Sequence, residues 1–207
     1  MDLQHPFRLL TQNLEGDILS VLSRAEKSYS GREVQRAVSA SQDAVRLALR
    51  RLVNQGIVTS EPGGGRAILY RLNRDHLAAP WIQGLASLRL ELIERLRGEI
   101  GNWDVQPVAA VLFGSAARNE ATETSDLDLL LIRPARIGTD DDSWQEQLIS
   151  LSEAASRWTG NDARVVEYGE DELMHLVGRE PVLQDAADEG VDLSGSFRRL
   201  WKKAGRS

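Results

Sequence analysis

Apolar residues in the first third of the chain recur at the three- and four-residue spacing of amphipathic helices. This spacing predicts a helix over residues 9–25. A second helix follows Ser30, where Glu33 completes the Ser-x-x-Glu pattern of a capping box. A third helix is predicted over residues 41–56. Two short strand-like runs surround a Pro-Gly-Gly-Gly turn within residues 57–73, and they predict a β-hairpin.

The middle and end of the chain mix helical and strand-like patterns. Leucine and isoleucine fall on one helical stripe over residues 82–100, which predicts a single amphipathic helix. Apolar runs predict strands over residues 108–113, 127–132 and 161–168, with a helix over residues 143–158 between the last two. The rest of the chain is expected to form two short helices followed by a tail.

Breaks in the pattern suggest four parts. We expect an N-terminal domain over residues 1–80, a connecting helix over 81–100, a second domain over 101–195 and a basic tail over 196–207. The fold class is therefore predicted to be α+β with two domains.

Three helices followed by a hairpin resemble the winged helix-turn-helix fold, in which the third helix enters the major groove and the wing lies against the DNA backbone. The resemblance implies binding of double-stranded DNA. Gln42, Arg46 and Arg50 would lie on the outward face of the third helix, and Arg66 at the wing tip. The alternative is that these arginines form a solvated surface and that the domain serves dimerisation or protein contacts. Winged domains often pair on half-sites, so a homodimer is an expectation.

Charge separates the two parts of the chain. The net charge is −6, but residues 1–80 hold 11 Lys and Arg against 8 Asp and Glu, whereas residues 81–207 hold 14 against 23. The first part is mildly basic and the second is acidic, which suggests different partners for the two, but the net charge of the first part is weak for a DNA-binding domain. Cysteine is absent, which excludes disulfides and thiolate metal sites. Apolar runs are too short to cross a bilayer, so we expect a soluble cytoplasmic protein with no membrane partner.

The chemistry is expected in the segment VLFGSAARNEATETSDLDLLLI, residues 111–132. An apolar run ends at Gly114 and Ser115, a polar stretch of helix-turn length follows, and a second apolar run carries Asp126 and Asp128. Two carboxylates separated by one residue leave the same face of a strand. Such a pair of oxygen ligands suits Mg²⁺ or Mn²⁺.

GSAARNE followed by SDLDLLL resembles the signature of the nucleotidyltransferase superfamily, in its compact form called the minimal nucleotidyltransferase. The resemblance extends over about residues 100–168 and implies a mixed β-sheet flanked by helices. One departure is Asn119, which stands where these sequences usually carry glycine. Asparagine tolerates a left-handed backbone better than most residues, so we expect the loop to be kept.

The resemblance implies transfer of a nucleoside monophosphate from a nucleoside triphosphate, with ATP the expected donor, onto an acceptor hydroxyl. Asp126 and Asp128 would hold two metal ions. Gly114, Ser115 and Ser125 would bind the nucleotide. Arg118 would take a phosphate oxygen, although it could equally be a surface arginine paired with Glu120.

The family usually brings a third carboxylate from a later strand. Glu167 is the first candidate, as a catalytic residue and metal ligand, because a charge inside the run VVEY is hard to explain by packing. Asp162 at the strand entrance is the second. If the strand face is reversed, Glu167 is only a solvent-facing residue.

Two functions remain open. The first is an enzyme whose acceptor is a partner toxin protein, as in toxin–antitoxin systems, or RNA, or a small molecule. The second is a DNA-binding transcriptional regulator whose nucleotidyltransferase-like domain only binds nucleotide or a partner.

Overall fold

The computed structural model describes residues 1–65 and 67–205. The chain divides into two compact units. One comprises residues 4–88 together with Asp2, and the other comprises the chain from Arg89 onward together with Met1 and Leu3. None of the helices in the described ranges is long and apolar enough to cross a membrane. Each unit is considered by itself.

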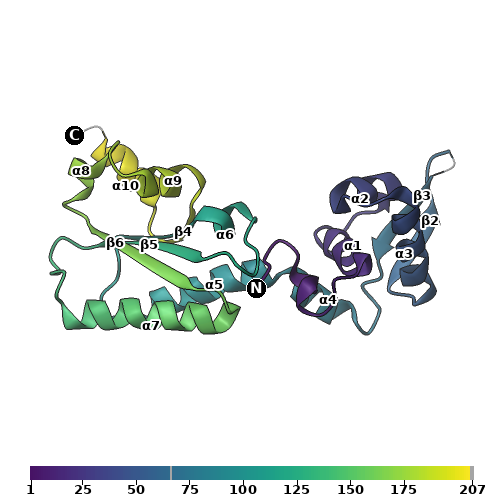
Figure 1. The fold of residues 1–207 in the computed structure, drawn as a ribbon, viewed down its shortest axis with the longest axis horizontal. Helices are drawn as coiled ribbons and strands as arrows, with labels where there is room; N and C mark the ends of the chain where they lie inside the picture. The colour runs from purple at the N-terminus through teal and green to yellow at the C-terminus, as the bar shows by residue number, and fades with distance from the viewer. Residues whose placement is uncertain (66, 206–207) are drawn as a thin grey trace. The chain divides into compact units, whose positions relative to one another are not determined.

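The N-terminal unit packs helices against a small antiparallel sheet (Figure 1). Its strands are ordered β1-β3-β2, and its core is formed by apolar residues such as Ile18, Val34 and Leu49. In chain order the elements are the 3-10 helix Pro6–Leu9, α1 Leu14–Ser23, β1 Tyr29–Ser30, α2 Gly31–Val38, α3 Gln42–Asn54, β2 Val58–Pro62, β3 Ile68–Leu72 and α4 Ala79–Ala86.

Local signals in this unit act as the sequence predicts. Ser30 accepts a hydrogen bond from the backbone N–H of Glu33, whose side chain accepts from the Ser30 N–H, so the capping box of α2 is confirmed. Ser41 caps α3 in the same way through the N–H of Ala44. The hairpin is confirmed as β2 paired with β3. The first helix is shorter than predicted, because a 3-10 turn precedes it and α1 begins only at Leu14.

The second unit is built on a four-stranded mixed sheet with the order β6-β5-β4-β7. β5 and β6 run parallel, whereas β4 is antiparallel to both of its neighbours. The expected mixed sheet flanked by helices is confirmed. In chain order the elements are α5 Leu88–Gly101, β4 Ala109–Phe113, α6 Gly114–Arg118, β5 Leu127–Arg133, α7 Asp142–Thr159, β6 Ala163–Gly169, α8 Leu173–Leu176, α9 Pro181–Glu189, β7 Val191–Ser194 and α10 Phe197–Ala204.

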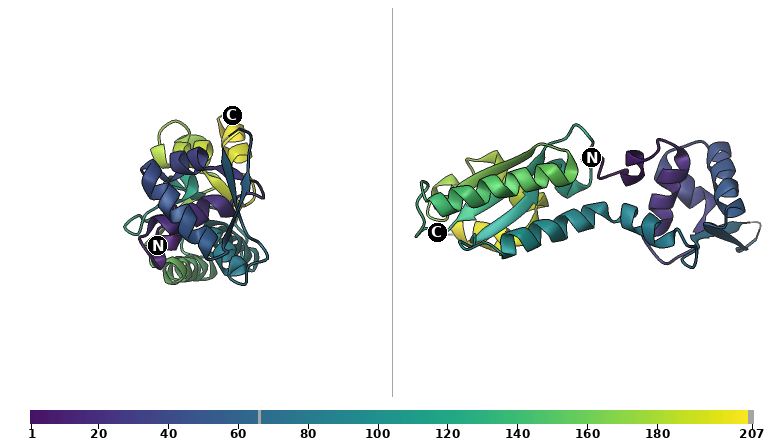
Figure 2. Two further views of the ribbon diagram at one scale, coloured as in Figure 1. Left: turned by 90° about the vertical axis from the view of Figure 1, so that its right-hand side faces the viewer. Right: turned by 90° about the horizontal axis from the view of Figure 1, so that it is seen from below.

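Helices cover both faces of this sheet (Figures 1 and 2). One face carries α5 and α7, and there Leu127, Leu129 and Leu131 of β5 join the core. The other face carries α8, α9 and α10, and there Leu130 and Ile132 are buried. The central strands are therefore apolar on both faces, which explains the continuous apolar runs AAVLF in β4 and LLLI in β5.

Three predictions about residues 82–207 need correction. The prediction of a single helix over residues 82–100 is wrong. Helix α4 ends at Ala86, and the Ser87 N–H donates to carbonyl oxygens of the last turn of α4. Helix α5 then packs in the core of the second unit, whereas α4 packs in the core of the N-terminal unit. Strand β7 was missed, because its four residues are too short to show a pattern. Most of the expected tail is helix α10, whose Phe197 and Trp201 are buried.

Candidate active site

The turn between β4 and α6 fits closely around a carboxylate. Phe113, the last residue of β4, pairs across the sheet with Asp128 of β5. Gly114 follows with a φ of 67°, a conformation that favours glycine. A Cβ at this position would lie 2.5 Å from Oδ2 of Asp128, so a larger residue would have to displace this carboxylate. Glycine is thus favoured here both by the backbone conformation and by the neighbouring side chain.

Asp126 and Asp128 interact through their charges. Burial raises the pKa of Asp128, and the neighbouring Asp126 raises it further, while Arg164 and Arg118 lower it. Both side chains remain partly accessible, and Asp126 is 34% exposed. The two carboxylates therefore form one electrostatic unit that can still meet a ligand from solvent.

Arg164 completes this group and was not predicted. It stands on β6 directly opposite Asp128 of β5 and bonds Asp126, with 2.7 Å between its Nη1 and Oδ2 of the carboxylate. Its Nε also lies 3.4 Å from Asp162. Alternation of side chains along a strand places Arg164 on the face opposite Glu167, but the sequence does not show which residues of the neighbouring strand that face meets.

The loop before Asp126 is held by a buried amide. Nδ2 of Asn161 donates to the carbonyls of Thr122 and Ser125, at 2.9 and 2.7 Å, and the N-terminal amine bonds its Oδ1. The Ser125 hydroxyl accepts from the Thr122 N–H. Ser125 therefore shapes the turn that presents Asp126, and Asn161 is a positioning residue that the sequence did not reveal.

The short helix α6 ends as predicted and carries Arg118. Asn119 takes the left-handed conformation, with φ 61°, so the expectation that asparagine would replace glycine here is confirmed. Arg118 bonds Glu120 at 2.8 Å and Glu189 at 2.9 Å, and these bonds raise its pKa. In this structure Arg118 is therefore a surface arginine paired with acidic side chains, which is the second of its two interpretations. Ser115 is half-buried at the start of α6.

Glu167 is not part of this group, which corrects its selection as the third carboxylate. It pairs in register with Leu131 and shares the α7 face of the sheet with Val165, whereas Asp128 and Arg164 lie on the other face. The Glu167 carboxylate accepts a hydrogen bond from the indole N–H of Trp144. It also lies 3.6 Å from Nε of Arg133, and this buried Nε makes no hydrogen bond within the described residues. A charge inside VVEY is explained by this internal ion pair.

The second candidate, Asp162, lies beside Arg164 but is already paired with it. Its carboxylate faces the guanidinium of Arg164 and is largely exposed. Among residues 1–65 and 67–205, no three acidic, histidine or cysteine side chains come together as a metal site. Two carboxylates nevertheless suffice for Mg²⁺, which usually binds one or two of them together with substrate phosphates and water. Asp126 and Asp128 fit one such ion.

Residues 93–173 match the family model of the nucleotidyltransferase domain. The matched segment contains Gly114, Asp126, Asp128 and Arg164, so the group described above lies within the part of the chain that resembles this family model. A search of curated proteins found no match.

Three solved structures resemble parts of the chain. A toxin–antitoxin crystal structure with AMP-PNP is 15% identical, covering 54% of this chain and 82% of that one, with a TM-score of 0.39. A mutant of the toxin–antitoxin MntA-HpeT is 17% identical, covering 56% and 82%, with a TM-score of 0.37. TrmBL2, an archaeal chromatin protein, is 16% identical, covering 86% and 72%, with a TM-score of 0.28. Scores this low support no conclusion about function.

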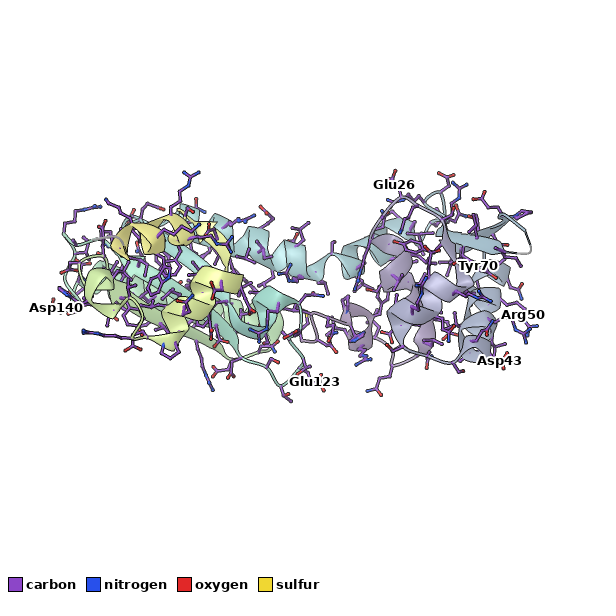
Figure 3. The ribbon with its side chains drawn as sticks, turned by 90° about the horizontal axis from the view of Figure 1, so that it is seen from above. Glu26, Asp43, Arg50, Tyr70, Glu123 and Asp140 are labelled. Atoms are coloured by element: carbon purple, nitrogen blue, oxygen red, sulfur yellow. The ribbon has the colours of Figure 1, made fainter. Side chains whose placement is uncertain are left out.

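The residues expected to bind DNA lie in the other unit. Gln42, Arg46 and Arg50 are exposed on α3, and Figure 3 shows Arg50 and Asp43 projecting outward from this helix. Arg46 forms a surface ion pair with Asp43 at 3.5 Å. Arg66 lies outside the described residues. A groove of about 630 Å³ runs between α2, α3 and β3 beside Gln42 and Arg46.

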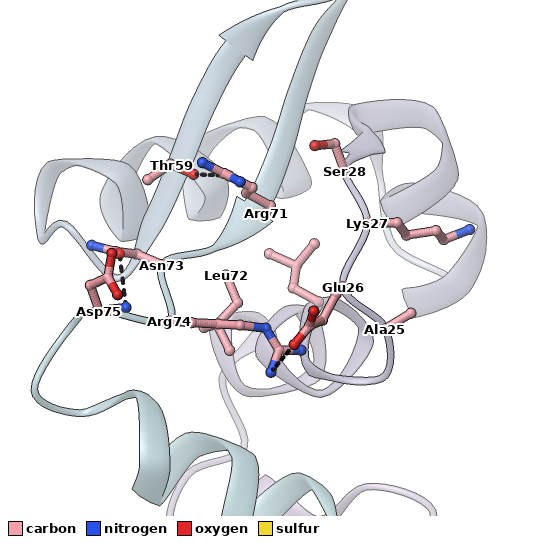
Figure 4. A pocket seen from close by; sticks show the side chains of 11 residues that line it. Ala25, Glu26, Lys27, Ser28, Thr59, Arg71, Leu72, Asn73, Arg74 and Asp75 are labelled. Atoms are coloured by element: carbon pink, nitrogen blue, oxygen red, sulfur yellow. Dashed lines mark hydrogen bonds and ion pairs between the residues drawn. The ribbon is translucent and has the colours of Figure 1, made fainter.

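A smaller hollow of about 260 Å³ lies elsewhere in the N-terminal unit (Figure 4). Its arginines are already paired: Arg74 lies 3.3 Å from Glu26, and Arg71 donates to the Thr59 hydroxyl at 3.2 Å.

Proposed function

We propose that the C-terminal unit is a nucleotidyltransferase that moves a nucleoside monophosphate from a nucleoside triphosphate, with ATP as donor, onto an acceptor hydroxyl. The observation that carries the proposal is the contact of Gly114 with Asp128 beside Asp126. A turn without a side chain allows phosphates to approach the backbone, and two adjacent carboxylates supply the ligands of the accompanying cation.

The roles follow from position. The backbone of Gly114 and the half-buried Ser115 would receive phosphate oxygens at the start of α6. Asp126 and Asp128 would hold Mg²⁺ or Mn²⁺, and the bound ion supplies charge neutralisation of the polyphosphate. Ser125 and Asn161 would keep Asp126 in place. Arg118 would reach a phosphate only by leaving Glu120 and Glu189.

Label transfer tests the proposal. The full chain is incubated with Mg²⁺ and triphosphate labelled at the α position, and with candidate acceptors: a co-expressed partner protein, tRNA, or an aminoglycoside as the small molecule. Asp126→Asn and Asp128→Asn should each reduce transfer by at least about 100-fold. Asp104→Asn, an exposed acid of the same unit outside the site, is the matched control. Transfer that survives in both variants would refute the proposal, and the labelled acceptor would show whether the protein belongs to a toxin–antitoxin pair.

We also propose that the N-terminal unit is a winged helix that binds double-stranded DNA. The exposure of Gln42, Arg46 and Arg50 on one helix supports this proposal, because they present amide and guanidinium donors beside an open groove. If this unit alone carries the function, the protein is a transcriptional regulator.

Fluorescence anisotropy of labelled duplexes separates the two functions. Arg46→Ala and Arg50→Ala should weaken binding, and each lost phosphate contact should reduce the slope of log K against log salt by about 1. Asp126→Asn and the remote Arg95→Ala should leave DNA affinity unchanged. No affinity for any duplex at low salt would refute DNA binding.

A further inference from the structure

Arg164 places a positive charge of the protein itself beside the two carboxylates of the candidate site. On the parallel pair β5–β6 it stands opposite Asp128, on the same face of the sheet, and its guanidinium is 2.7 Å from Oδ2 of Asp126. Asp162 contacts the same guanidinium at its Nε, at 3.4 Å. One positive side chain therefore lies among three carboxylates of which only Asp126 and Asp128 belong to the candidate site.

This position affects how a divalent cation can bind. The carboxylate of Asp126 has two oxygens, and one of them is in direct contact with Arg164. A metal ion that used both Asp126 and Asp128 would meet the positive charge of Arg164 beside the same carboxylate. The guanidinium cannot lose its charge by deprotonation, so the competition persists at every pH at which the protein is folded.

The number of ligands leads to the same conclusion. In two-metal sites the ions stand roughly 3.5–4 Å apart and need carboxylates to bridge and flank them. Here Glu167 is on the opposite face of the sheet, bound to Trp144, and Asp162 contacts Arg164. The described residues offer two carboxylates for metal and one fixed cation beside them.

We propose that Arg164 is a built-in cation of this site, which competes with a divalent metal ion for Asp126 and limits the site to one such ion. The inference rests on the proposed nucleotidyltransferase function and goes beyond it, because it replaces the two-metal arrangement expected from the family resemblance. Arg164 takes the place of the second ion in balancing the charge of Asp126 and Asp128.

Binding of Mn²⁺ alone to the full chain tests this directly, with free Mn²⁺ counted by electron paramagnetic resonance and no nucleotide present. Wild type should bind one Mn²⁺ per chain at this site. Arg164→Gln should tighten that binding by roughly tenfold, because a positive charge next to the ligands is removed. Arg164→Lys, which keeps the charge, should stay close to wild type. Arg157→Gln is the matched control, since Arg157 is similarly exposed and paired with one acid, Glu153.

Two further variants sharpen the result. Adding Asp126→Asn to Arg164→Gln should abolish the gain in affinity, because the competition is for Asp126. Arg164→Asp adds a third carboxylate opposite Asp128 and should raise the stoichiometry to two Mn²⁺ per chain. Thermal unfolding of each variant confirms that the protein measured is folded.

Equal Mn²⁺ affinity of wild type and Arg164→Gln would overturn the inference, as would two ions in wild type or a gain that persists without Asp126. If Mn²⁺ binding is lost in Asp126→Asn and Asp128→Asn but unaffected by Arg164→Gln, only the role of Arg164 fails and the proposed function stands. If no variant binds Mn²⁺, the inference fails, and the label-transfer assay decides on the enzyme separately.

Discussion

Gly114 and Asp128 are in such close contact that a single added carbon at Gly114 would come within 2.5 Å of the Asp128 carboxylate. The contact joins the end of β4 to the start of β5. The position of the loop that would receive phosphates therefore depends on the position of the carboxylate that would hold the cation. A change at either residue should disturb both.

Gly114→Ala should therefore damage the site more than the fold. We expect transfer activity to fall by at least about 100-fold as Asp128 is displaced, with a loss of stability of roughly 1–3 kcal/mol from the positive φ and the close contact. Gly98→Ala is the control: it lies in α5 with nothing within 4 Å of the added atom and should be neutral or stabilising. Activity and urea unfolding of both variants give the comparison. Full activity in Gly114→Ala would contradict the proposal that the backbone at Gly114 receives phosphate oxygens.

Glu167→Gln should have the opposite effect to Asp128→Asn. Removing the Glu167 charge leaves the Arg133 guanidinium, which is 7% exposed, without its carboxylate partner. We expect a loss of stability of about 2 kcal/mol with nearly unchanged turnover per folded molecule. Asp128→Asn should abolish turnover without loss of stability at neutral pH. A Glu167→Gln protein that is as stable as wild type but inactive would restore Glu167 as a catalytic candidate.

The free energy of unfolding of the protein should depend on pH through the protonation of Asp128. Because burial and Asp126 raise its pKa above the ordinary 3.8, Asp128 holds its proton more tightly in the folded state. This contribution to stability is present below the unfolded pKa and is lost as pH rises toward the folded pKa. The unfolding free energy of Asp128→Asn minus that of wild type should therefore increase with pH from about 3.8 upward and then level off. Urea unfolding at constant ionic strength measures it, and a difference that falls over this window would be contrary to expectation.

Neighbouring charges should move the Asp128 pKa in opposite directions. Asp126→Asn removes a negative charge that raises this pKa and should lower it, whereas Arg164→Gln removes a positive charge that lowers it and should raise it. Carbon-13 NMR of the Asp128 carboxyl in each variant gives both signs. No movement in either variant would show that the three side chains do not share one site in solution.

Asn161→Ala should loosen the loop that presents Asp126. It removes the amide that bonds the carbonyls of Thr122 and Ser125, at a cost of roughly 1–3 kcal/mol for buried groups left unpaired. Hydrogen exchange across residues 122–126 should become faster, and kcat should fall more than KM rises if the loop orients the cation ligand. Asn102→Ala, at an exposed asparagine of the same unit, is the control. Unchanged exchange in Asn161→Ala would remove its positioning role.

Local features of this protein follow from the sequence because they depend on neighbours along the chain. The capping box at Ser30 and Glu33, the hairpin after Gly56, the left-handed Asn119 and the alternation of Arg164 with Val165 are all set by short-range sterics and hydrogen bonds. The segment from Gly114 to Asp128 could be recognised for the same reason, since its spacing is local.

The identity of the partners was decided by the tertiary structure. Alternation along β6 shows that Glu167 and Arg164 face opposite ways, but only the parallel pairing with β5 brings Arg164, and not Glu167, to Asp126 and Asp128. Asn161 and strand β7 became part of the unit through long-range contacts in the same manner. A strand can present either face to a given neighbour at little local cost, and the choice is made by which face buries its apolar residues against α7 and which charges can then be paired.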